Sequence, residues 1–260
     1  MILRMIFKLF KIVFVILIFS IFLVCGIVLF DSSNEKSPDI DYIAEKKLDN
    51  NKWNISYRWK FVKDNLKKQK TEINIELLND ELAKSINTIE LSYEKCYSNN
   101  DFWSCFYKSV YSANLNYDKI FNVFEQYSKK ENLSERDKML MIISFVQNIK
   151  YERPMEFFDG IIKETDYLPP KNVVKEQIGD CDSKSLLMLI LLRKMNIDCV
   201  LFESDKYEHV MVGINVSSMG KYKTYNGKKY YFLESTYPGW LIGDISPDWS
   251  NLKFWRIINI

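Results

Sequence analysis

The chain has 260 residues, of which 47% are hydrophobic and 27% charged, and its formal net charge at pH 7 is +2. This length suits a membrane anchor followed by one sizeable domain or two small ones. Arg4, Lys8 and Lys11 are the only charged residues among the first thirty, so the remainder has a net charge of −1. A nearly neutral domain lacks the positive excess that attracts nucleic acid, and we therefore expect no nucleic-acid partner.

An uncharged run of 19 residues, Ile12 to Phe30, follows the basic N-terminus. At about 1.5 Å rise per residue, a helix of this length nearly crosses a hydrocarbon core of roughly 30 Å. Because positive charge favours the cytoplasmic side, we predict that residues 1–11 are cytoplasmic, that residues 12–30 span the membrane once, and that the rest is extracytoplasmic.

Two alternatives to an uncleaved anchor remain open. A cleaved signal peptide usually has a shorter apolar region that ends in small residues, and no such ending is present here. A lipid-modified Cys25 would follow a small residue, whereas Val24 stands before it. We therefore favour the single-pass anchor.

The chain has five cysteines and one histidine, which limits its disulfide and metal chemistry. Cys96 and Cys105 can form a disulfide outside the cell, if their Cα atoms lie close enough together. The other cysteines are Cys25, Cys181 and Cys199. With no Cys-x-x-Cys pair and a single histidine, a Cys/His zinc site is not expected, and we predict neither a metal nor a cofactor.

Residues 31–50 are polar and are interpreted as a stalk, followed by a region at 51–130 that combines a β-hairpin with helices. Apolar and aromatic residues alternate with polar ones over 53–61 and again over 71–77, which is the two-residue period of strands with one buried face. The polar connection between these segments predicts that they pair as a hairpin.

Helical spacing follows over residues 79–130, with a break at 99–101. A capping box at Ser134 then begins a helix that ends near Tyr151 and opens the core at 131–260. Residues 152–178 are predicted to form a long loop with a short helical turn near its end, since Pro169 and Pro170 force an extended backbone.

A further helix is predicted from Cys181 to about Met195, because this stretch contains neither Gly nor Pro. Several strands follow this helix, and an Asn226-Gly227 pair indicates a hairpin turn between two of them. The predicted strands are 199–203, 208–216, 229–235, 240–245 and 254–260. One helix followed by consecutive antiparallel strands predicts an α+β fold.

Cys181 stands at the start of that helix, directly after Gly179-Asp180. The Asp180 carboxylate can accept hydrogen bonds from the free amides of the first turn. These amides and the helix dipole favour an anion, so a thiol placed there loses its proton more easily and becomes nucleophilic. The alternative is a small buried cysteine with a structural role only.

A nucleophilic thiol needs a base within hydrogen-bond reach and a third group that orients the base. His209 is the single histidine of the chain and is therefore the one candidate for an imidazole base. It stands at the start of a predicted strand, and Glu234 stands near the end of the next one. Adjacent antiparallel strands can bring that carboxylate beside the imidazole.

These motifs resemble those of the transglutaminase-like superfamily, whose core is a papain-like cysteine-enzyme fold. Gly179-Asp180-Cys181-Asp182 is similar to the Gly-x-Cys helix start of that family, and Glu208-His209-Val210 is similar to its histidine at the head of a strand. Tyr231 to Thr236 is similar to its acidic segment, and Phe145 to Tyr151 to the helix before its catalytic loop. The resemblance covers roughly residues 134–245.

The resemblance implies a catalytic triad of Cys181, His209 and Glu234. The family usually has Asp at the third position, so Asp244 is the alternative to Glu234 for orienting the imidazole. It further implies a thioester acyl-enzyme formed from a protein or peptide substrate, with the backbone N–H of Cys181 as an oxyanion donor.

Three functions follow from these expectations. The first is a membrane-anchored extracytoplasmic cysteine peptidase or amidase that acts on peptide or isopeptide bonds. The second is a true transglutaminase, in which an amine replaces water as the acyl acceptor. The third is a catalytically silent module that binds a cell-envelope component. We favour hydrolysis because the sequence shows no recognisable second-substrate site.

Overall fold

The computed structural model describes residues 43–260, apart from 114, 159–160 and 165–166. The predicted cytoplasmic segment and membrane span at residues 1–30 lie outside this range, as does most of the predicted stalk. Within the described part, no helix has the length and apolar character that crossing a membrane requires.

The N-terminal sheet has three antiparallel strands in the order β1-β2-β3. They are β1 (Ile43–Asp49), β2 (Lys52–Val62) and β3 (Lys68–Leu78). Ile55 of β2 pairs with Ile75 of β3, and both are buried on the face that meets the helices. The predicted hairpin is therefore confirmed.

The interpretation of residues 31–50 as a stalk is wrong for its last part, because Ile43–Asp49 form β1 and pair along their whole length with residues 52–58 of β2. Residues 45–49 are exposed. An edge strand with no buried face needs no apolar alternation, so its polar composition carries no strand signal.

Four helices follow, with the predicted break near 99–101 and a second break, after Ser112, that the sequence analysis did not name. They are α2 (Asn79–Cys96), α3 (Phe102–Ser112), α4 (Asp118–Lys130) and α5 (Glu135–Asn148). The Ser134 hydroxyl accepts a hydrogen bond from the Asp137 amide at 3.0 Å, which confirms the predicted cap of α5. A sheet face and helices packed over it form the buried core, and Tyr57 of β2 meets Phe145 of α5 edge to face at 4.9 Å.

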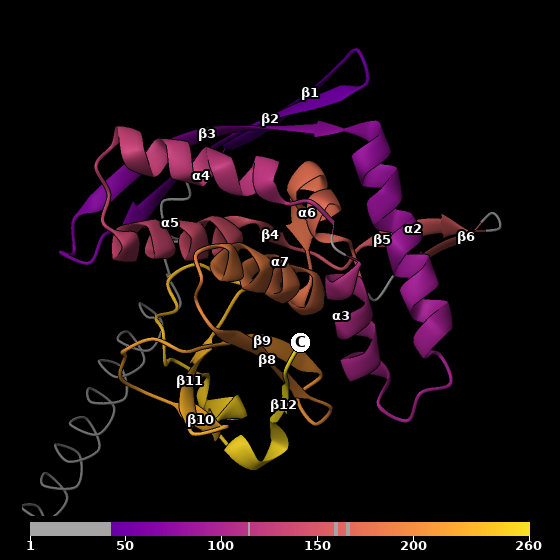
Figure 1. Cartoon of the computed structure of the whole chain (residues 1–260), viewed down its shortest axis with the longest axis vertical. Coiled ribbons are helices and arrows are strands. Elements are labelled where there is room, and N and C mark those ends of the chain that lie inside the picture. The colour runs from indigo at the N-terminus through magenta and orange to yellow at the C-terminus, as the bar shows by residue number, and fades with distance from the viewer. Residues whose placement is uncertain (1–42, 114, 159–160, 165–166) are drawn as a thin grey trace, which may run out of the picture. The chain divides into compact units, whose positions relative to one another are not determined.

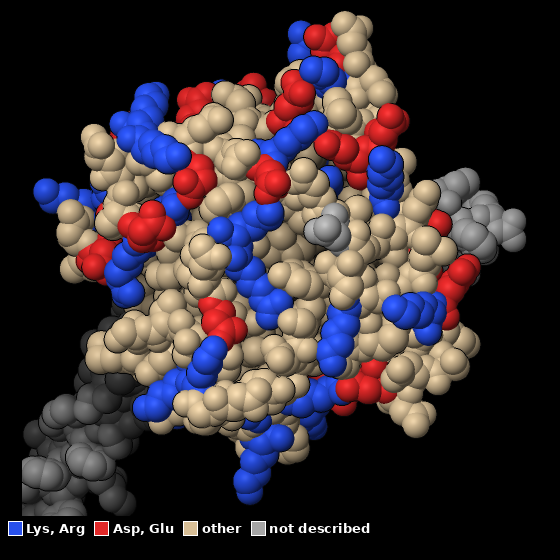
Figure 2. Space-filling view, viewed as in Figure 1, with Lys and Arg blue, Asp and Glu red and all other residues tan. Residues whose placement is uncertain are grey.

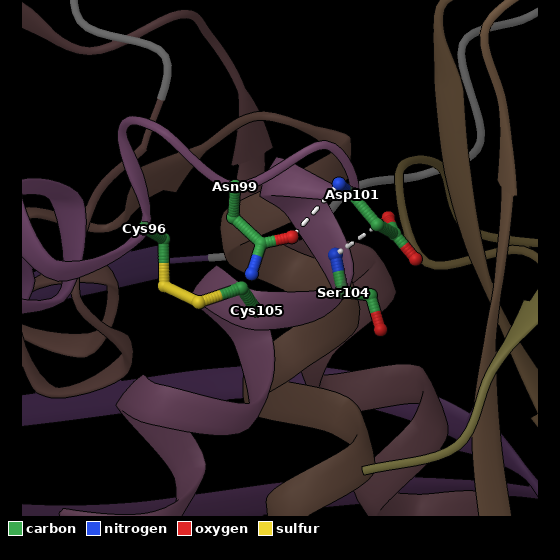
Figure 3. Close-up of a disulfide and its surroundings, with 5 residues drawn as sticks. All are labelled: Cys96, Asn99, Asp101, Ser104 and Cys105. Atoms are coloured by element: carbon green, nitrogen blue, oxygen red, sulfur yellow. Dashed lines mark hydrogen bonds between the residues drawn. A yellow bond between two sulfur atoms is a disulfide. The ribbon is translucent and has the colours of Figure 1, made fainter.

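A disulfide joins Cys96, the last residue of α2, to Cys105 in the first turns of α3, with 5.7 Å between the Cα atoms. Figure 3 shows the turn that it closes. The Asn99 side chain accepts a hydrogen bond from the Asp101 amide at 2.8 Å, and Asp101 accepts one from the Ser104 amide at 3.3 Å as the N-cap of α3. The disulfide therefore fixes α3 against α2.

Residues 152–178 do not form the long loop that was predicted. They contain β5 (Met155–Phe158), β6 (Ile161–Glu164) and α6 (Pro170–Glu176). Pro170 starts α6, because a residue in the first helical turn has no intrahelical partner for its N–H and the fixed φ of proline suits that position. Two-residue strands β4 (Lys150–Tyr151) and β7 (Ile178–Gly179) pair in parallel on either side of this segment.

The C-terminal sheet has five antiparallel strands in the order β10-β11-β9-β8-β12. It follows helix α7 (Cys181–Lys194) in the chain. The strands are β8 (Cys199–Ser204), β9 (His209–Ile214), β10 (Tyr222–Tyr225), β11 (Lys228–Leu233) and β12 (Arg256–Ile258). Asn226 and Gly227 have φ of 49° and 75°, as the predicted hairpin turn between β10 and β11 requires.

The strand predicted at 240–245 is wrong. The segment is irregular because Gly243, at φ 98°, turns its backbone against Met219 and Gly220 with no room for a side chain. Its amide donates to the Phe232 carbonyl at 2.7 Å, and its carbonyl accepts from the Lys221 amide at 2.8 Å. Two short 3₁₀ turns, η1 (Pro247–Trp249) and η2 (Leu252–Phe254), then lead to β12.

The described elements form an α+β arrangement in which helices lie between the two larger sheets (Figure 1). Helix α5 packs against β2 on one side and against α7 on the other, and α7 in turn packs against β8 and β9. Residues Cys181 and Ser183 to Leu192 of α7 are all buried, as expected of a helix enclosed on every side. The regions 51–130 and 131–260 therefore share one core.

Positive and negative side chains are intermixed on the face of the molecule that Figure 2 shows.

Candidate functional site

Cys181 is the first residue of α7, where the sequence placed it. The Asp180 side chain accepts a hydrogen bond from the Ser183 amide at 2.9 Å, so the predicted cap is confirmed. Gly179 does not have a positive φ, so its backbone conformation does not require a glycine. The glycine matters because it has no side chain. A Cβ at this position would lie 3.1 Å from Cγ of Lys184, so the glycine makes room for the stem of that lysine.

A cleft of about 360 Å³ opens at the N-terminus of α7. It brings Cys181 and His209 to one cavity although 28 residues separate them in the chain. Aromatic and charged side chains form its walls. The lining residues are Trp103, Tyr151, Arg153, Asp180, Cys181, Asp182, Glu203, Ser204, Asp205, Glu208, His209 and Val210.

His209 and Glu234 are hydrogen-bonded, with 2.9 Å between Nε2 and Oε2. His209 begins β9 and Glu234 follows the end of the adjacent antiparallel β11, so the register of the two strands brings the residues together. Both side chains are buried. Because an ionised carboxylate can only accept, Nε2 carries the proton of this hydrogen bond. In the neutral imidazole, Nδ1 is then unprotonated and can act as an acceptor.

The other oxygen of Glu234 has its own partners. Oε1 accepts hydrogen bonds from the Ser235 amide, the Thr236 amide and the Thr236 hydroxyl at 2.8, 2.8 and 2.6 Å. Burial alone would raise the pKa of Glu234, but the hydrogen bond and charge of His209 and the Thr236 bonds outweigh it and hold this pKa below its usual value. The carboxylate is therefore fixed in position and ionised.

Asp244, the alternative for the third position, is exposed and accepts a hydrogen bond from the Leu241 amide at 2.9 Å. It closes its own turn, while Glu234 pairs with His209. On the other side of the imidazole, the Trp249 ring lies over His209 with 4.4 Å between the ring centroids. The imidazole is thus held between a carboxylate and an aromatic face.

Cys181 shares its cleft with His209 and Val210 at the start of β9, and the backbone N–H of Val210 acts to lower the pKa of the thiol. The thiol donates to Oδ2 of Asp182 at 3.3 Å. Oδ1 of Asp182 accepts from the hydroxyl of Tyr107 on α3. At rest the thiol is therefore hydrogen-bonded to a neighbouring carboxylate, in the cleft that also holds His209.

The expectation that the helix start makes this thiol more acidic is wrong for the structure as it stands. Burial raises the pKa of Cys181 well above its ordinary value, and the carboxylates of Asp182 and Asp180 raise it further. The resting form of Cys181 is a protonated thiol.

The two flanking carboxyls are perturbed as well. Burial and the proximity of Asp182 raise the pKa of Asp180 to about 7. Burial also raises the pKa of Asp182, although hydrogen bonds from Tyr107 and Cys181 oppose the rise. A buried and a half-buried acid with raised pKa values beside a thiol are typical of a functional site, and such acids also occur in structural networks.

Three consecutive polar residues after Asp182 connect α7 to its surroundings, and sequence reasoning assigned none of them a role. The Ser183 hydroxyl accepts from the Leu168 amide at 2.7 Å, and the Ser185 hydroxyl donates to the Val210 carbonyl at 3.1 Å. Lys184 donates to three backbone carbonyls. Burial lowers the pKa of Lys184 to about 7, a fall that Glu234 opposes. A polar triplet opening an otherwise apolar helix was the available signal.

Within residues 43–260, as far as they are described, no group of three or more His, Cys, Asp or Glu side chains is arranged to hold a metal ion. The chain matches no family model, no curated protein and no solved structure.

Proposed function

We propose that this protein is a cysteine hydrolase that cleaves peptide or isopeptide bonds through Cys181, His209 and Glu234. The observation that carries the proposal is the 2.9 Å contact between His209 Nε2 and Glu234 Oε2 beside a cysteine in the same cleft. Such a contact holds an imidazole in the tautomer that can accept a proton from a nucleophile.

In the acylation step, Nδ1 of His209 takes the proton of the Cys181 thiol as the sulfur attacks the amide carbonyl. Glu234 stabilises the imidazolium that forms. The backbone N–H of Cys181, at the helix start, donates to the developing oxyanion, and one such donor is worth about 10²–10³ in rate. The imidazolium then protonates the leaving amine, and a thioester remains on Cys181.

Water completes the reaction in a hydrolase. His209 takes a proton from the water as it attacks the thioester, and the thiol leaves with that proton restored through the imidazole. Because Cys181 rests as a thiol, proton transfer accompanies attack, and no preformed thiolate–imidazolium pair is needed. The thiol, which donates to the Asp182 carboxylate at rest, must turn its proton from that acceptor to His209.

The order of elements supports a papain-like core of the transglutaminase-like type. A cysteine at the start of a buried helix precedes an antiparallel sheet whose adjacent strands carry the histidine and the acid. Glu234 takes the place of the usual Asp. Its carboxylate still reaches the imidazole, so the longer side chain is compatible with the third role.

The Cys96–Cys105 disulfide supports an extracytoplasmic location, since disulfides persist in oxidising compartments. Together with the uncharged run at 12–30, it favours a domain held at the outer face of a membrane with a peptide or cell-envelope substrate.

The test is hydrolysis of a peptide library by residues 43–260, with fragments identified by mass spectrometry and Cys181→Ala as the matched control. We expect cleavage that Cys181→Ala abolishes. Cleavage that survives in Cys181→Ala, or products that carry an added primary amine in preference to water, would contradict hydrolysis at this thiol. Binding without turnover would favour the silent module.

A further inference from the structure

Lys184 is a lysine with no exposed surface, three residues after Cys181 on α7. Its ammonium donates to the backbone carbonyls of Gln147, Ile149 and Thr236, the first at 3.3 Å and the last at 2.7 Å. In its charged form the lysine has three N–H donors, and these three carbonyls then satisfy it completely. A buried cation needs such partners, since its burial is otherwise costly.

Two of the three carbonyls belong to the end of α5. Gln147 is in its last turn and Ile149 is its C-cap. The final carbonyls of a helix lack intrahelical partners and carry the negative end of the dipole, so a cation is favoured there. Lys184 therefore joins the cysteine helix to the C-terminus of α5.

The third carbonyl belongs to the segment that orients His209. Thr236 accepts from Lys184 through its carbonyl, while its amide and hydroxyl donate to Oε1 of Glu234. The lysine and the carboxylate are thus linked through a single residue. A shift of Thr236 would move two of the three donors that hold Oε1 of Glu234.

Gln147 adds a second connection between the same elements. Its side-chain amide donates to the Glu234 carbonyl at 2.9 Å and to the Trp240 carbonyl at 3.0 Å. The segment after β11 is therefore held from α5 and from α7 at once.

We propose that Lys184 is a positioning residue, which clamps the Glu234–Thr236 segment to α5 and to the cysteine helix so that Glu234 keeps its contact with His209. The catalytic meaning of the clamp rests on the proposed function. The contact that it maintains is measurable without substrate.

The single histidine makes a direct test possible, because a sample of residues 43–260 labelled with ¹⁵N-histidine contains one imidazole. The readout is the exchange rate of the His209 Nε2 proton with water, measured by NMR in the wild type and in Lys184→Met. We expect a slowly exchanging proton in the wild type and exchange at least about tenfold faster in Lys184→Met, since the acceptor carboxylate is then no longer held in place.

Lys138→Met is the matched control. Lys138 is also a buried lysine, but it lies in the first turn of α5 and pairs with Glu125 and Glu135, at the opposite end from the clamp. We expect it to lower the melting temperature and to leave the His209 proton unchanged. Lys184→Gln is measured alongside, because its shorter side chain cannot reach all three carbonyls and it serves if Lys184→Met does not fold.

Wild-type exchange in the folded Lys184 variants, or equal acceleration in Lys138→Met, would overturn the clamp. Turnover gives the second readout. We expect a lower kcat with little change in KM in the Lys184 variants, because misplacement of a positioning contact can cost about 10²-fold in rate. If the wild type proves inactive, the proposed function fails while the exchange measurement still decides the role of Lys184.

Discussion

Nε2 of His209 lies 2.9 Å from Oε2 of Glu234, and the remaining oxygen of that carboxylate is held by Ser235 and Thr236. Both oxygens of Glu234 therefore have partners, one oxygen within its own segment and the other on the imidazole. The glutamate is long enough to reach His209 from the residue after β11, which removes the main structural objection to a glutamate at this position.

Glu234→Gln tests this contact with a side chain of nearly the same shape. The amide lacks the charge that stabilises the imidazolium and its NH₂ group cannot accept from Nε2, so we expect kcat to fall by about 10²–10⁴-fold. Steady-state kinetics on the cleaved peptide measures it. Asp244→Asn is the control and should retain wild-type turnover; a larger loss there than in Glu234→Gln would assign the third role to Asp244.

The acidity of Cys181 gives a second prediction. In Asp182→Asn the carboxylate that raises the pKa of the thiol is gone, so the thiol pKa should fall. Each unit of fall gives about tenfold more thiolate at a given pH below that pKa. The rate of alkylation by iodoacetamide against pH reports it, with Asp205→Asn as an exposed control from the same cleft. An unchanged pH profile in Asp182→Asn would show that Asp182 does not control the thiol.

Asp180 provides a prediction on stability. Its folded-state pKa is raised to about 7, so the folded protein binds a proton more tightly than the unfolded chain does. Stability from this group is therefore greatest below the unfolded pKa and is lost as pH rises from about 4 to about 7.

Asp180→Asn keeps an oxygen for the Ser183 amide and removes the ionisation. We expect the variant to equal the wild type near pH 4 and to be more stable above pH 7, by an upper bound of roughly 4 kcal/mol for a shift of about three pKa units. Urea denaturation across this range measures the difference. A constant difference at all pH values would argue against a buried ionising Asp180.

The disulfide gives a fourth prediction. Cys96→Ser with Cys105→Ser frees the turn before α3, and loop-closure entropy predicts a loss of about 2–3 kcal/mol in the free energy of unfolding. Helix α3 also carries Trp103 of the cleft wall and Tyr107, the partner of Asp182, so KM should rise. Reductant should weaken the wild type and leave the double variant unchanged. If reductant weakens both proteins equally, the loss of stability does not come from the Cys96–Cys105 disulfide.

The parts of the fold that were predictable either bury one face, so that their apolar residues are regularly spaced, or end at a residue that favours a cap or a turn. The hairpin at 53–77 buries one face, so its side chains alternate. Helix α5 has a cap at Ser134, and the turn at Asn226-Gly227 requires positive φ. In each case a local rule and the tertiary environment favour the same structure.

The parts that were missed depend on contacts made elsewhere in the chain. β1 is an exposed edge strand without alternation. The short helical turn predicted near the end of 152–178 is part of α6, but the start of that helix at Pro170 was missed because the two prolines suggested extended backbone. The segment at 240–245 begins with three apolar residues and was predicted as a strand, but the close approach of Gly243 to Met219 and Gly220 prevents one. Tertiary packing decided these three segments.

The candidate site divides in the same way. The residue types and their order along the chain predicted Cys181, His209 and Glu234, since a thiol, an imidazole and a carboxylate have recognisable chemistry. The clamp formed by Lys184 and Gln147 was not predictable, because it acts through backbone carbonyls of residues that carry no signal themselves. The raised pKa of Cys181 likewise depends on burial, which no local pattern reports.

The most direct measurement is acylation of Cys181 by a peptide p-nitrophenyl ester, followed by mass spectrometry of the acylated residue in the wild type and in His209→Ala. The fully buried Cys199 is the internal control. We expect one acyl group on Cys181 in the wild type and acylation slower by about 10²-fold or more in His209→Ala, since general-base catalysis contributes about 10²–10⁴. Equal acylation rates in the two proteins would contradict a catalytic pairing of Cys181 with His209.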